Sequence, residues 1–167
     1  KLAEDSLKKA RVISFQKMKN VKVDELEKIK DKHPFAYTAG SDGFWDYDIP
    51  IIESSFVTEE VGTGFVHMAP SHGAEDYEEF VKRGWTDQLT HNVEEDSSFS
   101  EKVPFFGGLE IFNKKGKEAK GNEAIIQKLI EVGALMARGR LKHSYPHSWR
   151  SKAPILFRNT NQWFVSI

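Results

Sequence analysis

A histidine and an aspartate that lie nine positions apart are the residues of this chain best suited to carry chemistry. His67 lies in the run Phe65–Met68, which we predict to be a short strand, and Asp76 lies in the first turn of a predicted helix, Ala74–Arg83. The tight turn Pro70–Gly73 joins the two elements, because Pro70 ends the strand and Gly73 lets the chain reverse. The turn can bring an imidazole and a carboxylate to the mouth of one pocket.

Both residues also have an ordinary structural explanation. An aspartate in a first helical turn is favoured by the helix dipole, and a single histidine on a strand is often a hydrogen-bonded core residue. At about 100° per residue, Asp76 lies about 90° from the centre of the apolar face that Tyr77, Phe80 and Val81 form. Asp76 is therefore a boundary residue, and the spacing alone leaves both explanations open.

Other familiar sites are missing from the sequence. Gly62-Thr63-Gly64 lacks the third glycine of a dinucleotide-binding loop, and there is no Walker lysine motif, His-Glu-x-x-His or Gly-x-Ser-x-Gly. The absence of Cys excludes a disulfide scaffold, thiol catalysis and Cys-ligated metal sites. His143 and His147 flank Pro146, which prevents a regular helix there, so we favour a structural role for them and predict no metal site.

Composition indicates one globular domain. The chain has 167 residues, 24 Lys and Arg against 25 Asp and Glu, and 12% aromatic residues. No apolar stretch approaches the ~20 residues that span a bilayer, so no membrane association is predicted. A net charge near zero argues against a blanket of positive charge and leaves room for a local RNA-contacting patch. The chain begins at Lys1 and stops on the strand-like run Gln162–Ile167, so we expect both ends to be cuts in a longer polypeptide.

Local patterns predict a compact α/β domain with short strands and few helices, more barrel-like than a regular βαβ array. Further predicted helices are Leu2–Ala10, one turn within Asp24–Lys32, and Asn122–Val132. Asn122 would cap the last of these helices and Gly133 would end it. Gly84 would end the helix Ala74–Arg83. Predicted strand regions are Arg11–Val23, parts of Phe35–Phe56, Val103–Phe112 as a hairpin or bent strand, and much of the chain from Ala134 onward. Thr86–Ser100 is expected to be irregular, and Lys114–Lys120 to be a basic loop.

Two runs of residues resemble a known family. Gly62–Tyr77 reads Gly-Thr-Gly-Phe-Val-His-Met-Ala-Pro-Ser-His-Gly-Ala-Glu-Asp-Tyr, which closely resembles the signature of the editing domain inserted in class I isoleucyl-tRNA synthetases of the bacterial type. The run His143–Phe164 resembles the segment by which that insertion returns toward the catalytic domain. The resemblance implies that residues 1–167 are a single editing-domain fragment of the valyl, leucyl and isoleucyl type. It also implies a barrel-like β core with surrounding short helices, and a returning segment at about 143–167.

The resemblance implies post-transfer editing, in which the ester joining a wrong amino acid, chiefly valine, to the terminal adenosine of isoleucine tRNA is hydrolysed. One methylene gives too little discrimination at a first site, a limit for which this family is itself the usual example, so a second pocket must reject isoleucine by size. The implied partners are the valine-carrying 3′ end of isoleucine tRNA and the catalytic domain of the parent enzyme, in the cytoplasm. Editing needs no cofactor, whereas the parent enzyme uses ATP and Mg²⁺.

Site roles follow from the motif positions. Asp76 would pair with the α-ammonium group of the misattached residue, and His67 would line the side-chain pocket or position the ester. A bound water molecule would attack the ester, because no covalent nucleophile is evident. Gly62 and Gly64 would permit close approach of the ligand, and Thr63 and His72 are further substrate-binding candidates. His72 would also support the turn, together with Gly73 and Tyr77.

The chain departs from the family pattern in ways that limit the expected activity. It lacks the Thr-rich strand with a Pro-Trp pair that forms the other wall of the editing pocket. It also lacks the His-x-Gly-His and Lys-Met-Ser-Lys-Ser signatures, so we expect no aminoacylation and weak or absent editing by the fragment alone. Ser71 and Ser148 replace residues that are commonly Gly and Cys.

Two alternatives remain. The chain could be a tRNA-docking module without hydrolytic activity, using Lys114, Lys115, Lys117 and Lys120 to contact phosphates. It could also be the editing domain of a valyl- or leucyl-tRNA synthetase, which share the Gly-Thr-Gly and a downstream Asp. The wording His67-Met68-Ala69-Pro70 disfavours this second alternative.

Overall fold

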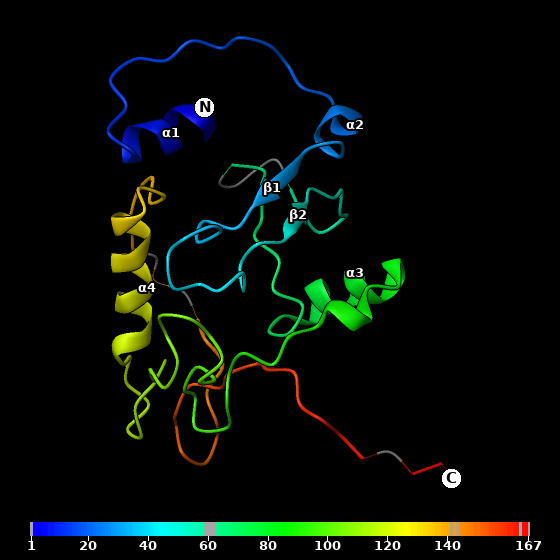
Figure 1. Cartoon of the computed structure of the whole chain (residues 1–167), viewed down its shortest axis with the longest axis vertical. Coiled ribbons are helices and arrows are strands. Elements are labelled where there is room, and N and C mark those ends of the chain that lie inside the picture. Colours follow the sequence, from blue (N-terminus) through cyan, green and yellow to red (C-terminus); the bar gives the residue numbers. More distant parts are fainter. Residues whose placement is uncertain (1, 59–62, 141, 143, 164, 167) are drawn as a thin grey trace. The chain divides into compact units, whose positions relative to one another are not determined.

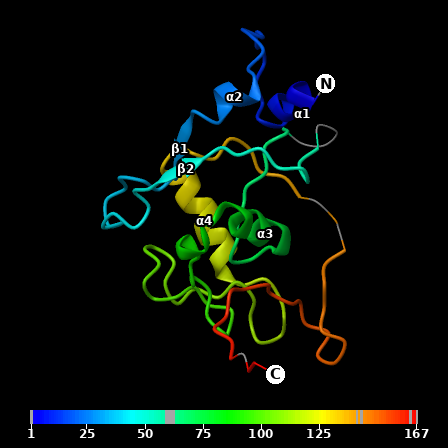
Figure 2. The same ribbon diagram turned by 90° about the vertical axis from the view of Figure 1, so that its right-hand side faces the viewer.

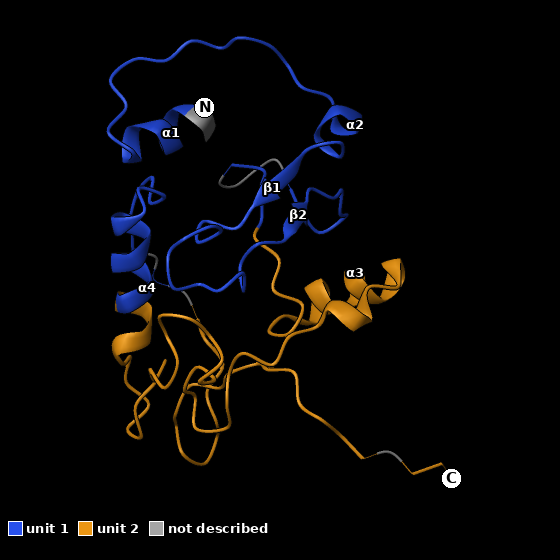
Figure 3. Cartoon of the chain, viewed as in Figure 1, with its two compact units in different colours: residues 1–66, 124–143 blue, residues 67–123, 144–167 orange. Residues whose placement is uncertain are grey.

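A computed structural model describes residues 2–58, 63–140, 142, 144–163 and 165–166. Its elements are few and short, and long irregular stretches join them (Figure 1, Figure 2). They are α1 (Leu2–Lys9), α2 (Val23–Leu26), β1 (Lys30–Lys32), β2 (Asp48–Pro50), α3 (Ala74–Arg83), the 3-10 turn η1 (Thr86–Gln88) and α4 (Lys120–Glu131). The chain forms two compact units, one of residues 1–66 and 124–143 and one of residues 67–123 and 144–167 (Figure 3).

The first unit contains a two-stranded antiparallel sheet and an aromatic cluster. β1 pairs with β2 so that Lys32 lies opposite Asp48, and the two side chains form an ion pair. This pairing raises the pKa of Lys32 and lowers that of Asp48, mainly through their hydrogen bond. After β1 the chain makes tight turns around a core of Phe35 and Trp45, with the His33 ring stacked on Trp45 at 4.3 Å between centroids. The turns predicted within Phe35–Phe56 are confirmed, with β2 as the one strand in that range, whereas β1 forms at the end of Asp24–Lys32, where only a helical turn was predicted.

The second unit is built mainly from loops. Its buried apolar residues are Val93, Val103 and Phe106, and paired residues near them form isolated bridges rather than strands. Val93 pairs with Phe99, and Ser98 pairs with Glu110. The segment predicted as a hairpin or bent strand is therefore a series of turns held by bridges, and the predicted irregularity of residues 86–100 is confirmed.

Helix α3 has the predicted bounds, and its packing differs from the prediction. Gly84 adopts a left-handed conformation (φ 70°), and its amide donates to the carbonyls of Phe80 and Val81, which ends the helix. Phe80 packs edge-on against Trp85. Glu79 does not belong to the predicted apolar face, yet it is buried and pairs with Lys82 and Arg83. Hydrogen bonds from these two side chains lower the pKa of Glu79, which keeps the buried carboxylate charged.

Several predicted strands are absent from the described residues. Residues 11–22, 65–69 and 134–140 have no ladder partner, and Ile13 and Phe65 are exposed. A strand requires a neighbour to take up its backbone hydrogen bonds, and no described segment supplies one here. β1–β2 is the single sheet among the described residues, so the chain is a mixed α/β protein and the barrel-like core is not confirmed.

Helix α4 starts two residues earlier than predicted. Asn122 lies inside the helix, where its side-chain amide donates to Glu118 at 3.0 Å, so the prediction that it caps the helix is wrong. The stop at Gly133 is confirmed, because this residue is left-handed and its amide donates to the Ile130 carbonyl at 3.0 Å. No helix in the described part of the chain is both long and apolar enough to cross a bilayer.

Replacing Gly121 with Ala should destabilise the protein although Gly121 lies in a helix. Alanine normally favours a helix over glycine, but a Cβ at Gly121 would lie 2.8 Å from the Glu110 carbonyl oxygen and 3.1 Å from the Phe99 ring. We expect the free energy of unfolding to fall by about 1–3 kcal/mol. Gly139→Ala is the matched control, since a Cβ there meets no atom within 4 Å. Chemical denaturation showing equal stability for both variants would contradict this packing.

Candidate functional site

The loop before α3 is closed by the Asp76 side chain. Asp76 Oδ2 accepts a hydrogen bond from the Ala69 amide at 2.7 Å, in a partly buried position. The Ala69 carbonyl in turn accepts from the amides of His72 at 2.8 Å and Gly73 at 3.0 Å. Ala69 thus uses both its donor and its acceptor within the loop. The carboxylate is held close to the segment that carries His67.

Gly73 makes room for this arrangement. It is the N-cap of α3, with extended backbone angles (φ −134°, ψ 133°). A Cβ at this position would lie 3.0 Å from Asp76 Oδ2 and 3.3 Å from its Cγ. A side chain here would therefore press on the carboxylate that closes the loop. The sequence predicted a glycine turn at this point without indicating that the aspartate occupies the space.

His67 lies two residues before Ala69, in the irregular segment that was predicted as a strand. It is exposed, and its imidazole makes no hydrogen bond or ring contact with any residue that the structure describes. The Asp76–Ala69 hydrogen bond brings the carboxylate near the chain on which His67 lies, without a direct bond between the two side chains.

The Gly-Thr-Gly run lies at the end of the other unit. Thr63 Oγ1 donates to the Phe65 carbonyl at 3.3 Å and accepts from the Phe65 amide at 3.2 Å, which forms a local turn. Gly64 has φ 78°, and a Cβ there would meet no atom within 4 Å. Glycine is favoured here by the backbone conformation rather than by crowding within the chain. Gly62 lies outside the described residues.

His72 joins the loop before α3 to the C-terminal segment. Its Nδ1 lies 2.8 Å from the Phe157 carbonyl oxygen. A carbonyl can only accept, so Nδ1 carries the proton and donates it. In the neutral ring Nε2 is then left as an acceptor. The expected supporting role of His72 in the turn thus extends to a contact between residues 85 positions apart.

Neighbouring residues of the C-terminal segment are held in the same way. Arg158 forms an ion pair with Glu95 at 3.4 Å, and the Asn159 carbonyl oxygen lies 3.4 Å from His91 Nδ1. Ser71, which is buried, accepts a hydrogen bond from the Thr90 amide at 3.1 Å. Three consecutive residues of an irregular segment are therefore fixed by side chains of residues 72–95.

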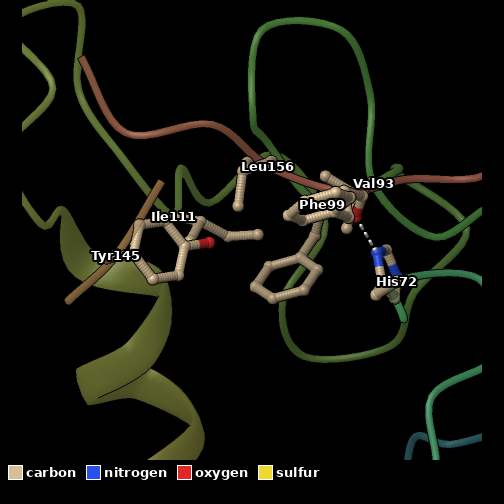
Figure 4. A pocket seen from close by; sticks show the side chains of 7 residues that line it. His72, Val93, Phe99, Ile111, Tyr145 and Leu156 are labelled. Atoms are coloured by element: carbon tan, nitrogen blue, oxygen red, sulfur yellow. Dashed lines mark hydrogen bonds between the residues drawn. The ribbon is translucent and has the colours of Figure 1, made fainter. Parts of the chain in front are cut away.

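A hollow of about 240 Å³ lies beside His72. Apart from the imidazole its lining is mainly apolar and aromatic, and in Figure 4 His72 and Tyr145 stand at opposite ends of the row of side chains. The lining residues are His72, Val93, Phe99, Ile111, Tyr145, Leu156 and Phe157. His67 and Asp76 do not line it. The motif predicts a site role for His72, but no sequence pattern indicates this hollow, because its lining residues are spread from position 72 to position 157.

A second hollow, of about 280 Å³, lies beside the basic loop. Asn113 Oδ1 accepts hydrogen bonds from the amides of Lys115 and Lys117, so these lysines project from a tight, exposed turn. Lys114 lines the hollow together with three acidic residues, Glu94, Glu95 and Asp96. Hydrogen bonds from Ser98, with a smaller contribution from Lys114, lower the pKa of Asp96. The carboxylates partly offset the positive charge of the loop.

The histidines near the C-terminus show no metal-like grouping. His147 Nδ1 donates to the Tyr145 carbonyl at 2.7 Å, which is a local structural contact. His143 lies outside the described residues. Within the described part of the chain, no three His, Asp or Glu residues are grouped so that they could hold a metal ion.

The known proteins that resemble this chain all carry the same name. No family model matches the chain, but it is 47% identical over its whole length to the isoleucine–tRNA ligase of Ruegeria pomeroyi. It is 42% identical to that of Rhodopseudomonas palustris and 40% identical to that of Agrobacterium fabrum, each over 99% of the chain. The chain spans only 17–18% of the length of these relatives.

The relatives are all aminoacyl-tRNA synthetases. More particularly, the chain corresponds to one segment of the isoleucine–tRNA ligases. The resemblance of Gly62–Tyr77 and His143–Phe164 to isoleucyl-tRNA synthetases is thereby confirmed.

Asp76 should contribute to stability through the Ala69 hydrogen bond. Asp76→Ala leaves the Ala69 amide without its acceptor, and we expect the free energy of unfolding to fall by about 1–3 kcal/mol. Asp76→Asn should keep most of that stability, because its side-chain oxygen can still accept. Urea denaturation of the two variants measures the difference. An alanine variant as stable as the asparagine variant would show that the bond does not hold the loop.

Proposed function

We propose that this chain is the editing domain of an isoleucyl-tRNA synthetase and hydrolyses the ester that links valine to isoleucine tRNA. The observation that carries the proposal is the full-length similarity to isoleucine–tRNA ligases, since the matched segment includes the run from His67 to Asp76. Within that run the Asp76 hydrogen bond to Ala69 keeps the carboxylate beside the chain that carries the imidazole.

Asp76 would bind the α-ammonium group of the misattached amino acid. One of its oxygens accepts from Ala69 at 2.7 Å, but a carboxylate has about four lone-pair sites, so further donors can be accommodated. The partly buried position would strengthen a charge-assisted hydrogen bond relative to one in water. The Ala69 bond also limits the positions that the carboxylate can take, so the ammonium group would meet an oriented acceptor.

His67 would line the pocket for the amino-acid side chain or position the ester. Its imidazole is exposed and bonded to no described residue, so a ligand need not displace an internal partner. A water molecule would attack the ester carbonyl carbon. The bond to the ribose oxygen then breaks, the ribose oxygen takes a proton, and valine leaves as the free amino acid. Rejection of isoleucine would follow from the size of the pocket.

The proposal places this chain within a longer enzyme that works in the cytoplasm on isoleucine tRNA. Aminoacylation, with ATP and Mg²⁺, would belong to the catalytic domain of that enzyme, because the nucleotide-binding signatures do not occur in this sequence. The barrel-like core and the role of residues 143–167 as the returning segment are part of the same proposal. Thr63, Gly64 and Gly62 would contact the substrate from the run preceding His67.

The alternatives have less support. A pure docking role rests on the basic loop, and carboxylates of Glu94, Glu95 and Asp96 line the same hollow as Lys114. Phosphates would therefore meet both signs of charge there. A valyl or leucyl assignment is disfavoured because the relatives with 40–47% identity are isoleucine–tRNA ligases.

Removing the charge of Asp76 should slow hydrolysis of valyl-tRNA. We expect Asp76→Asn, in a full-length ligase that carries this segment, to deacylate valyl-tRNA(Ile) about 10- to 100-fold more slowly, because a charge-assisted bond is worth roughly 1.5–3 kcal/mol. The assay is release of labelled valine from preformed valyl-tRNA.

Glu75→Gln is the matched control for that experiment. Glu75 lies in the same helical turn, is exposed and carries the same charge, so the variant should deacylate at the original rate. Equal rates for Asp76→Asn and Glu75→Gln would remove Asp76 from the mechanism.

Replacing His67 should change selectivity more than stability. His67 is exposed and makes no described side-chain bond, so His67→Ala should unfold at nearly the same denaturant concentration. We expect the ratio of valyl- to isoleucyl-tRNA hydrolysis to fall, since the pocket becomes larger. A variant whose ratio matches the original would show that His67 does not shape the pocket.

A further inference from the structure

We propose that the hollow beside His72 binds one unstacked nucleobase from the single-stranded 3′ end of an RNA. The inference rests on the proposed function, which supplies the RNA, and adds a second contact region that neither His67 nor Asp76 lines. It is carried by the chemistry of the hollow, the tautomer of His72 and the position of the hollow beside the loop that Asp76 closes.

The walls of the hollow suit a flat aromatic ring. Three of its seven lining residues are aromatic, namely Phe99, Tyr145 and Phe157. Phe157 is 55% exposed and Tyr145 is 40% exposed, so both residues keep accessible surface. Figure 4 shows the Tyr145 ring at one end of the row of lining side chains. Bases of single-stranded nucleic acids bind by stacking on such rings. None of the lining residues is acidic, so a polyanion would meet no carboxylate in the wall.

His72 adds a polar anchor of defined type. Because Nδ1–H donates to the Phe157 carbonyl at 2.8 Å, Nε2 of the neutral ring is an acceptor. The side chains of valine and isoleucine have no donor to offer it. Adenine and cytosine each carry an exocyclic amino group, which can donate to Nε2. A base of this kind therefore matches the hollow better than an aliphatic amino-acid side chain does.

The hollow also lies next to the proposed ester site. The His72 amide donates to the Ala69 carbonyl at 2.8 Å, and the Ala69 amide donates to Asp76 at 2.7 Å. One loop therefore carries both the imidazole of the hollow and the carboxylate that would bind the ammonium group. A base near the end of an RNA could occupy the hollow while the terminal ester lies near Asp76.

The test measures binding of short RNAs ending in CCA by fluorescence anisotropy. Three further RNAs each lack the base at one of the last three nucleotides. With the unaltered protein, we expect one of these abasic RNAs to bind at least about fivefold more weakly than the intact RNA. In Phe157→Ala that penalty should disappear, because the stacking surface is gone. Equal penalties in the two proteins, or no binding of the intact RNA, would overturn the proposal.

A matched control uses another aromatic residue of the same segment. Trp149 is 76% exposed and does not line the hollow, so Trp149→Ala should keep the abasic penalty. If Trp149→Ala also bound the abasic and intact RNAs equally, the weaker binding of the abasic RNA would reflect general stacking on exposed aromatic residues. That result would overturn the proposed base site in the hollow.

A second variant keeps the proposal testable if Phe157→Ala does not fold. His72→Phe keeps an aromatic ring of similar size and has no hydrogen-bond acceptor. Two RNAs are compared that differ only in the exocyclic amine of the base whose removal weakens binding. The unaltered protein should bind the RNA with the amine more tightly, and the variant should bind both RNAs equally. Failure of the base test, together with slowed editing by Asp76→Asn, would overturn this inference alone. Conversely, suppose that the abasic penalty is seen and disappears in Phe157→Ala, while Asp76→Asn edits at the normal rate. The base site in the hollow would then be supported, and the role of Asp76 in hydrolysis would be overturned.

Discussion

The hydrogen bond from the Ala69 amide to Asp76 is the constraint on which the proposed site depends. It reaches back from the first turn of α3 across seven positions and closes a loop that has no sheet to support it. Gly73 leaves the space that the carboxylate needs. The same side chain that would recognise a positive charge thus also shapes the backbone on which His67 and His72 are carried. Structural and functional explanations of Asp76 are therefore compatible.

The C-terminal segment is the second structural feature of this unit. It has little regular structure, and side chains hold it by contacts from His72 to Phe157, Glu95 to Arg158 and His91 to Asn159. The contact from His72 to Phe157 links the two runs of sequence that resemble isoleucyl-tRNA synthetases. Both runs contribute to the hollow beside His72, together with Val93, Phe99 and Ile111 from the chain between them. A change at residue 157 would therefore affect a site that also includes residues up to 85 positions away.

Local features were predicted well and long-range ones were not. The bounds of α3 and its end at Gly84 follow from helix periodicity and glycine conformation, which act within a few residues. The expected strand at residues 65–68 failed, because β-branched and aromatic residues favour a strand only where a partner takes up their hydrogen bonds. Glu79 is buried because Lys82 and Arg83 compensate its charge, which an apolar-face pattern does not register. The motif predicts roles for His67 and Asp76, whereas the hydrogen bond to Ala69 and the hollow depend on long-range contacts that no sequence pattern indicates.

The most direct test is an NMR titration of the protein with a non-hydrolysable amide of valine and adenosine. The central claim is that Asp76, held by Ala69, receives the ammonium group of this ligand. We predict saturable shifts of the Ala69 and His67 amide signals, and their loss when the valine amino group is acetylated. Shifts that are absent, or that persist unchanged with the acetylated ligand, would contradict it.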